Sequence, residues 1–232
     1  MANPPGSLNL AALDFRLVDA LRDTVPSSAS RYMYLEDAYS RLWYKHPWAF
    51  THALSSFAVA TATNEYVLSD EIAEVAALFN ATQQKYITMN KGMFMYFQSY
   101  RDDSHGGPLY TNIDIRETGG KQTVIFGEVP GTGSADLGVG DTIQVYYCKH
   151  IIHNDATGGT ATGNMTIGTN VPSFSPQFHT LIMKEALIEA IKNRRDFQEM
   201  YQLAVAERDE MLKDMRRHYM TPQRQNTVRI YR

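Results

Sequence analysis

The sequence predicts an α+β protein that is mainly helical, with N-terminal and long C-terminal helices packed around a small antiparallel β-region and an extended C-terminal tail. Apolar residues recur at spacings of three and four near both ends of the chain, which is typical of amphipathic helices. In the middle they alternate with polar residues, which is typical of strands. We therefore expect a single domain over residues 1–220, with a β-region of about residues 50–153 inserted between helices, and a tail over residues 221–232.

Two helices are predicted near the N-terminus. The first covers residues 8–25, and Pro26 ends it because proline cannot continue a helix. The second covers residues 31–46, with N-cap candidates in Ser27–Ser30, and it should stop before Pro47. Their apolar stripes are formed by Leu10, Leu13, Leu17, Ala20 and Leu21 in the first helix, and by Leu35, Ala38, Tyr39, Leu42 and Trp43 in the second.

The first half of the β-region is less regular. One or two strands are expected over Phe50–Thr63, and a strand leading into a turn over Asn64–Ile72. The segment Ile72–Phe79 suits a further strand or a short helical piece. The apolar segments Tyr86–Met89 and Met93–Tyr100 suit either a buried helix or a strand, because a short apolar run has no decisive periodicity.

Three more strands follow with clearer signals. Tyr110–Arg116 alternates in polarity, and Gly119-Gly120 predicts a hairpin into Thr123–Phe126. A glycine-rich loop over Pro130–Asp141 then leads to Thr142–Cys148, which is rich in β-branched and aromatic residues. Because these strands are joined by short connections, we expect them to form an antiparallel meander.

The C-terminal part is predicted to be helical after a loop. Asn154–Asn170 contains few large apolar residues and is expected to be an exposed, mobile loop. Ser175 is placed to cap a helix whose first residue is proline, and the helical pattern runs over Pro176–Met220. The apolar stripe shifts phase near Lys192–Arg195, so this stretch is either two helices with a turn or one long bent helix.

Length and composition limit the class of protein. A chain of 232 residues can bury a core without disulfides or a structural metal. Its formal net charge of −3 argues against a wholly basic nucleic-acid binder. The single cysteine, Cys148, excludes an intrachain disulfide and a cysteine-based zinc site, which fits a reducing cytoplasm. Without a signal-peptide pattern or a long apolar run, we expect a protein that is neither secreted by a signal peptide nor membrane-spanning.

No catalytic, metal or cofactor site is predicted. Gly131–Gly133 follows a strand, but Asp136 stands where a dinucleotide-binding fingerprint needs its third glycine. Cys148, His150 and His153 are clustered soft ligands, but a fourth zinc ligand is missing and His153 would point to the other face of a strand. Carboxylate pairs are expected to be solvated, and the chain has no Gly-x-Ser-x-Gly elbow. We therefore expect that the protein is not an enzyme.

Charge is divided unequally along the chain. Residues 1–175 hold 11 basic and 17 acidic side chains, whereas residues 176–232 hold 11 basic and 8 acidic ones. The last acidic residue is Asp214, so all the charged side chains after it are basic. In the tail, apolar Val228, Ile230 and Tyr231 alternate with polar residues. Such a segment suits addition to the edge of a partner's sheet or an acidic groove, although a solubilising terminus is the plain alternative.

The order of these parts and several of their residues resemble a known family. An amphipathic helix is followed by a second helix that ends in the Trp43/Trp48 cluster, then by Tyr66-Val67-Leu68-Ser69-Asp70 and a β-region. Pro176 opens the C-terminal helical part, which has the spacing Asp196-Phe197-x-x-x-Tyr201. This layout resembles the head-to-tail adaptor (connector) proteins of tailed bacteriophages, whose first strand region ends in Y-x-L-P-x-D, with Ser69 here where proline is usual. The resemblance covers Leu8 to Tyr219.

The resemblance implies a structural virion protein of the neck, assembled in the host cytoplasm. Such proteins form a ring, commonly of twelve copies, beneath the portal of the DNA-filled head, and they extend the DNA channel. The implied partners are the portal protein, further copies of the chain, the next neck or tail protein and genomic DNA passing through the lumen non-specifically. No membrane, cofactor or metal is implied.

The resemblance also implies which residues dock. The loops Pro130–Asp141 and Asn154–Asn170 would face the tail side or the lumen. The implied portal-docking residues are Gln223, Arg224, Val228, Arg229, Ile230, Tyr231 and Arg232. The implied residues of a helix at a subunit or portal interface are Met211, Met215, Arg216, Arg217 and Tyr219.

Two alternatives from other classes remain open. The chain is compatible with another phage ring component, such as a stopper, a tail terminator or a tail tube, which would be built mainly on β-sheets. It is also compatible with a small hydrolase acting on cell wall or nucleic acid, which would need a convergent polar cluster.

Overall fold

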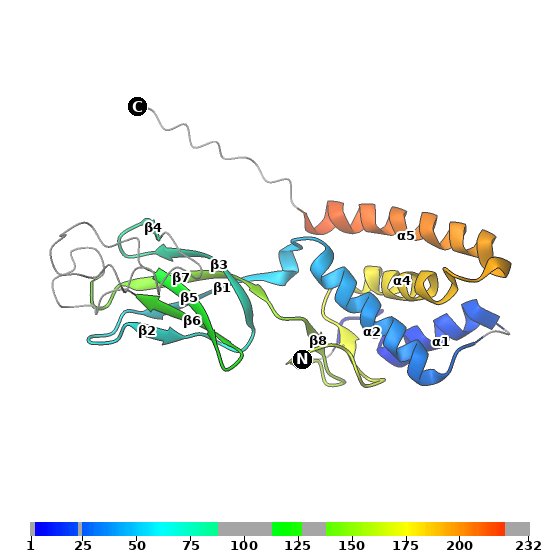
Figure 1. The fold of residues 1–232 in the computed structure, drawn as a ribbon, viewed down its shortest axis with the longest axis horizontal. Helices are drawn as coiled ribbons and strands as arrows, with labels where there is room; N and C mark the ends of the chain where they lie inside the picture. The colour runs from blue at the N-terminus through cyan, green and yellow to red at the C-terminus, as the bar shows by residue number, and fades with distance from the viewer. Residues whose placement is uncertain (1–2, 23–24, 88–112, 127–137, 221–232) are drawn as a thin grey trace, which may run out of the picture. The chain divides into compact units, whose positions relative to one another are not determined.

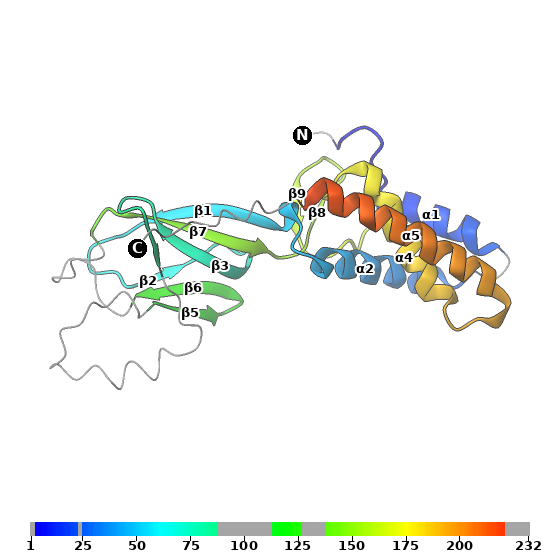
Figure 2. The ribbon, with the colours of Figure 1, turned by 90° about the horizontal axis from the view of Figure 1, so that it is seen from above.

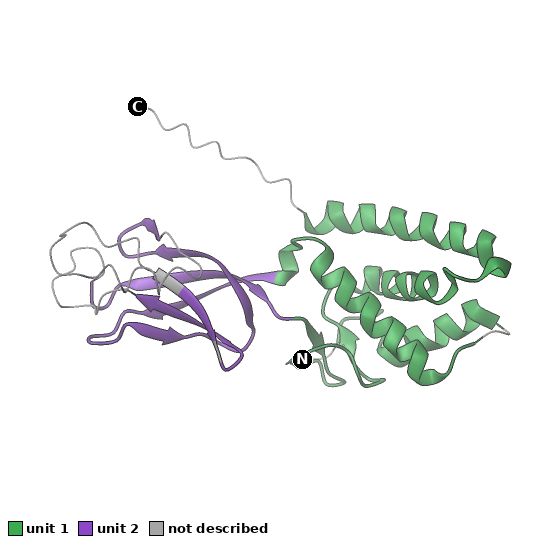
Figure 3. Ribbon diagram, viewed as in Figure 1, with its two compact units in different colours: residues 1–51, 151–232 green, residues 52–150 purple. Residues whose placement is uncertain are grey.

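The computed structural model describes residues 3–22, 25–87, 113–126 and 138–220. The chain divides into two compact units, one formed by residues 1–51 and 151–232 and the other by residues 52–150 (Figure 3). The α+β class is confirmed, because helices and antiparallel sheets are both abundant. Each unit has its own hydrophobic cluster, so the four helices and the sheets of residues 52–150 belong to separate cores. The second unit falls within the β-region that was predicted at about residues 50–153, and the single domain over residues 1–220 stays a prediction.

The helical unit is organised around one central helix. Helix α4 contacts α1, α2 and α5, and nine of its 13 residues are buried. Figure 1 shows α4 lying between α5 and the pair formed by α1 and α2. The helices are α1 (Leu10–Leu21), α2 (Ser28–Lys45), α4 (His179–Ile191) and α5 (Gln198–Tyr219), with short 3-10 turns η2 (Ala49–Thr51), η3 (Pro176–Phe178) and η4 (Arg195–Phe197).

The two N-terminal helices start at side-chain caps, whereas α4 and α5 do not. Asn9 caps α1 by accepting a hydrogen bond from the Ala12 N–H at 2.8 Å, and Ser27 caps α2. Ser175 makes no side-chain cap bond, and Pro176 opens the 3-10 turn η3, so α4 begins only at His179. The phase shift near residues 192–195 corresponds to two separate helices, since α4 ends at Ile191 and α5 starts after η4.

The core of the helical unit is aromatic as well as aliphatic. Both tryptophans, Trp43 and Trp48, are buried in it. The indole N–H of Trp48 donates to the Leu42 carbonyl at 2.6 Å, which satisfies its only donor. The buried Tyr39 hydroxyl donates to the Ile152 carbonyl and lies 3.2 Å from the Ser173 hydroxyl; burial raises the pKa of Tyr39 to about 12.

The prediction that residues 154–170 form an exposed, mobile loop is wrong. Strands β8 (Ile152–Asn154), β9 (Thr160–Thr162) and β10 (Val171–Pro172) form a small antiparallel sheet, and Met165 is completely buried. The carbonyls of Asn170 and Gly168 accept hydrogen bonds from the first two N–H groups of α1 at 2.8 and 2.9 Å. These N–H groups have no partner inside their helix, so the segment is ordered by the end of α1 that it completes.

The second unit contains two antiparallel sheets. One has the order β1-β7-β3-β4 and the other β2-β6-β5 (Figures 1 and 2). The strands are β1 (His52–Ala58), β2 (Glu65–Val67), β3 (Ile72–Asn80), β4 (Lys85–Ile87), β5 (Ile113–Thr118), β6 (Lys121–Phe126) and β7 (Thr142–Lys149). The segment that suited a strand or a helix is thus β3.

The predicted meander is only partly present. Strands β5 and β6 form the expected hairpin, and both Gly119 and Gly120 have positive φ angles, of 61° and 79°, which a tight hairpin turn needs. Strand β7 pairs with β1 and β3 instead of β6, so a three-strand meander is wrong. Being central in its sheet, β7 buries Ile143, Val145 and Tyr147 on one face. The segments predicted at 88–100 and most of 130–141 lie outside the described residues.

One histidine joins the N-terminus to the helical core. His179 is fully buried; its Nδ1 accepts the Leu8 N–H at 3.0 Å, and its Nε2 lies 2.9 Å from the Phe174 carbonyl. Since Leu8 can only donate and Phe174 can only accept here, the ring is neutral with its proton on Nε2. Burial lowers the pKa of His179 below its ordinary value of 6.5.

We expect the helical unit to lose stability as the pH falls below about 6.5, because the unfolded chain binds a proton there that the folded His179 does not accept. His179→Gln should cost roughly 1–3 kcal/mol at pH 7.5 and should flatten this pH dependence. Urea unfolding followed by tryptophan fluorescence measures it, since both tryptophans lie in this unit. The control is His150→Gln, in the other unit. A wild-type pH profile in His179→Gln would contradict the assignment.

Candidate docking surface at the end of helix α5

Helix α5 binds the rest of its unit by one face only. Its fully buried residues are Ala204, Leu212 and Met215, which recur at helical spacing and pack against the core that contains α4. Met215 is completely buried, so the protomer uses it as a core residue, and its expected place at a subunit or portal interface stays a prediction. Met211 is half-buried, and Arg216 and Arg217 are exposed.

Tyr219 anchors the end of α5 to its own unit. Its hydroxyl accepts the Ser175 N–H at 2.6 Å, and its ring lies 4.7 Å from Phe50 and 5.7 Å from Phe178, centroid to centroid. Burial raises the pKa of the Tyr219 phenol. The last turn of α5 is therefore held in place, and Tyr219 offers little of its surface to a partner.

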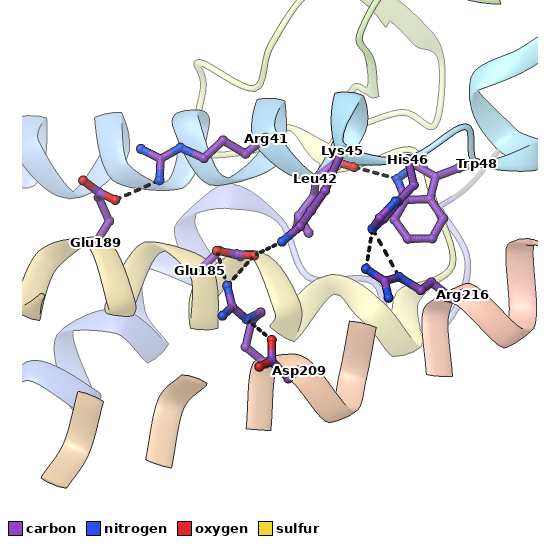
Figure 4. A network of polar contacts seen from close by, with 10 residues as sticks. Arg41, Leu42, Lys45, His46, Trp48, Glu185, Glu189, Asp209 and Arg216 are labelled. Carbon is purple, nitrogen blue, oxygen red and sulfur yellow. Dashed lines mark hydrogen bonds and ion pairs between the residues drawn. The ribbon is translucent and has the colours of Figure 1, made fainter. Parts of the chain in front are cut away.

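Arg216 is held by a neutral histidine. Its guanidinium lies 2.7 Å (Nη2) and 3.2 Å (Nε) from Nε2 of His46, at the end of α2 (Figure 4). Because a guanidinium only donates, His46 accepts with an unprotonated Nε2. Burial lowers the pKa of His46, and the positive charges of Arg216 and Lys45 lower it further.

A shallow groove lies beside the exposed part of this last turn. It has a volume of about 510 Å³, and apolar and charged side chains both line it. Phe178 and Met211 are its apolar residues, and Arg217 pairs with Asp214 at 3.1 Å. Since both charges of that pair are more than half exposed, the pair contributes little stability and is free to exchange partners. The remaining lining residues are Gln177 and His218.

A buried carboxylate ties three helices together behind this surface. Glu185 of α4 is 8% exposed, and its oxygens lie 3.3 Å from Lys45 of α2 and 3.3 Å from Arg208 of α5 (Figure 4). Arg208 Nε is also 2.7 Å from Asp209, close enough for an ion pair but not aligned for a hydrogen bond. Glu185 is not among the predicted site residues, although the sequence carries a signal for it: it is a charged residue within the apolar stripe of α4.

A second ion pair, one helical turn further along α4, is more open to water. Glu189 binds Arg41 at 2.8 Å and also pairs with Lys192. These hydrogen bonds lower the pKa of Glu189.

The structure gives no geometry for the predicted tail. Gln223, Arg224, Val228, Arg229, Ile230, Tyr231 and Arg232 lie outside the described residues. The predicted helix residues are brought together at one end of α5, but only Arg217 and part of Met211 face the groove.

The other candidate motifs take structural roles. Cys148 lies 3.3 Å from His52 Nε2 across β1 and β7, and His153 instead contacts the Gly163 carbonyl at 2.9 Å in the helical unit. Over the described ranges, no three His, Cys, Asp or Glu side chains lie close enough to hold a metal ion. Among the helices that the structure describes, none is both long and apolar enough to cross a bilayer.

Comparisons with known proteins leave the family open. No protein-family model matches the chain, and no curated protein sequence matches it either.

We predict that Glu185→Gln destabilises the helical unit by about 1–3 kcal/mol, because it leaves Lys45 and Arg208 without their buried counter-charge. The matched control is Glu189→Gln on the same helix, which should cost under about 1 kcal/mol because Arg41 is half exposed. Urea unfolding followed by tryptophan fluorescence compares the two. Equal losses would show that the Glu185 network does not bind the helices together.

Proposed function

We propose that the protein is a structural virion component, a head-to-tail adaptor that forms a ring beneath the portal, joins the head to the tail and extends the DNA channel. The proposal rests on the layout of the chain: both ends build one helical unit, and a β unit is inserted between them. The observation that carries it is helix α5. It is bound by one face, exposes the other and ends in the basic turn Arg216–His218, beyond which the sequence has no acidic residue.

The proposed docking element consists of the last turn of helix α5 and the segment 221–232 that follows it. The Tyr219 and Arg216 contacts hold the end of α5, so the basic segment 221–232 starts from an anchored helix. Its arginines Arg224, Arg229 and Arg232 suit an acidic groove on the portal, and Val228, Ile230 and Tyr231 suit an added strand. Arg217 and Met211, beside the groove at the end of α5, would complete the contact.

Other ring components of a phage neck or tail remain the second candidate. The observation that favours them is the β unit, whose two antiparallel sheets make up an independent core. In that case the β unit, not the C-terminal segment, would make the principal contacts.

Deleting residues 221–232 should abolish binding to purified portal rings of the same phage while leaving the protomer folded, because the helical core ends at Tyr219. Co-sedimentation measures binding, and circular dichroism checks the fold. The matched control replaces Val67, an exposed residue of β2, by alanine and should bind normally. Portal binding by the truncated protein would refute the docking role of the tail and favour the β unit.

We also expect the isolated chain to be a monomer or weakly associated, and to assemble into a ring only on a portal template. The reason is that the charged, exposed face of α5 offers few apolar contacts to a second copy. Mass photometry of the protein with and without portal rings measures this. A closed ring formed by the chain alone would contradict it.

A further inference from the structure

The outer face of the sheet β1-β7-β3-β4 is apolar and exposed at several points. The inner face buries alternate residues such as Leu78 and Val145, so their neighbours along each strand point outward. Three large outward side chains are open to solvent: Leu54 is 59% exposed, Tyr146 45% and Tyr86 82%.

Strand register aligns these side chains in rows. Leu54 of β1 and Ala77 of β3 both lie opposite Tyr146 of β7, which puts an aliphatic side chain on each side of Tyr146. In the next row, Phe79 lies opposite both Gln144 and Tyr86.

The aromatic rings contact one another across the strands. The His52 ring stacks on Tyr146 with centroids 5.5 Å apart and an angle of 17° between planes. Phe79 and Tyr86 make an edge contact at 5.0 Å. The result is a platform of rings interrupted by hydrogen-bonding groups, among them Gln144, Ser56 and Glu74.

The size of this platform favours a small or narrow ligand over a protein. Four strands span about 14 Å, and two rows of side chains give an area on the order of 200 Å². A stable protein–protein interface needs roughly 800 Å² on each partner. The platform is therefore too small to hold a second copy or another globular protein by itself.

The charge of the unit that carries the platform limits the classes of ligand further. Residues 52–150 contain six basic and eleven acidic side chains, and Glu74 lies on the outer face opposite Cys148. Phosphate groups would be repelled by this unit, which disfavours nucleic acids although bases also stack on aromatic rings.

We propose that this face binds a neutral polysaccharide chain. The C–H groups on the flat side of a sugar ring are weakly positive and apolar, and they pack on the electron-rich face of Tyr146 that points away from His52 and on the ring of Tyr86. The sugar hydroxyls both donate and accept, so the amide of Gln144 and the hydroxyl of Ser56 can bond to them. The site lies in the β unit and is independent of portal docking.

Affinity electrophoresis of the full chain in native gels containing dextran, laminarin or galactomannan tests the proposal. The wild type should be retarded by at least one of the three. Tyr146→Ala should weaken binding about tenfold or more by removing the central ring, and Tyr146→Phe, which keeps the ring, should stay within about twofold. Val67→Ala, exposed on the other sheet, is the matched control and should bind like the wild type.

Several results would overturn the proposal. If none of the three polysaccharides retards the wild-type protein, the proposal is wrong. It is also wrong if a folded Tyr146→Ala protein binds as strongly as the wild type. Binding of a single-stranded oligothymidylate that Tyr146→Ala abolishes would assign the face to nucleic acid instead. A change in sedimentation coefficient caused by Tyr146→Ala would assign it to self-association.

Discussion

The burial of helix α4 is the constraint on which the helical unit depends. Three other helices pack around it, so every polar group that it carries inward needs a partner from elsewhere in the chain. His179 obtains its partners from Leu8 and Phe174, and Glu185 obtains them from Lys45 and Arg208. These contacts join the N-terminal segment, α2 and α5 to one helix, and so they bring both ends of the sequence into a single core.

This arrangement determines what α5 can offer a partner. Its inward face supplies Leu212 and Met215 to the core, and its last turn is held by Tyr219 and Arg216. The outward face of α5 is then available without any rearrangement of the core. Binding through a short segment that leaves an anchored helix loses conformational entropy only in the segment itself.

In the β unit only one face of the four-stranded sheet has to be buried, because a sheet has two faces. The inner faces are filled by aliphatic and aromatic residues, and a buried carboxylate, Asp141, accepts hydrogen bonds from Asn80 and Gln83 at 2.8 Å each, which fixes the turn after β3. The outer face of the four-stranded sheet is open to solvent, so its polar side chains need no partner from the protein. It carries the exposed rings of Tyr86 and Tyr146. Exposed aromatic side chains that lie close together often mark a binding site.

The sequence by itself determined the features that arise from neighbouring residues: the helices around Leu13 and Leu42, the Gly119-Gly120 hairpin, and the β-region between helices. It did not predict which strands pair with β7, the order in residues 154–170, or the roles of Glu185 and His179. Most of those depend on groups far apart in the sequence, such as the Asn170 carbonyl at the start of α1. Only the tertiary structure decides them, because a buried donor or acceptor takes whichever partner the packing of distant segments brings within reach.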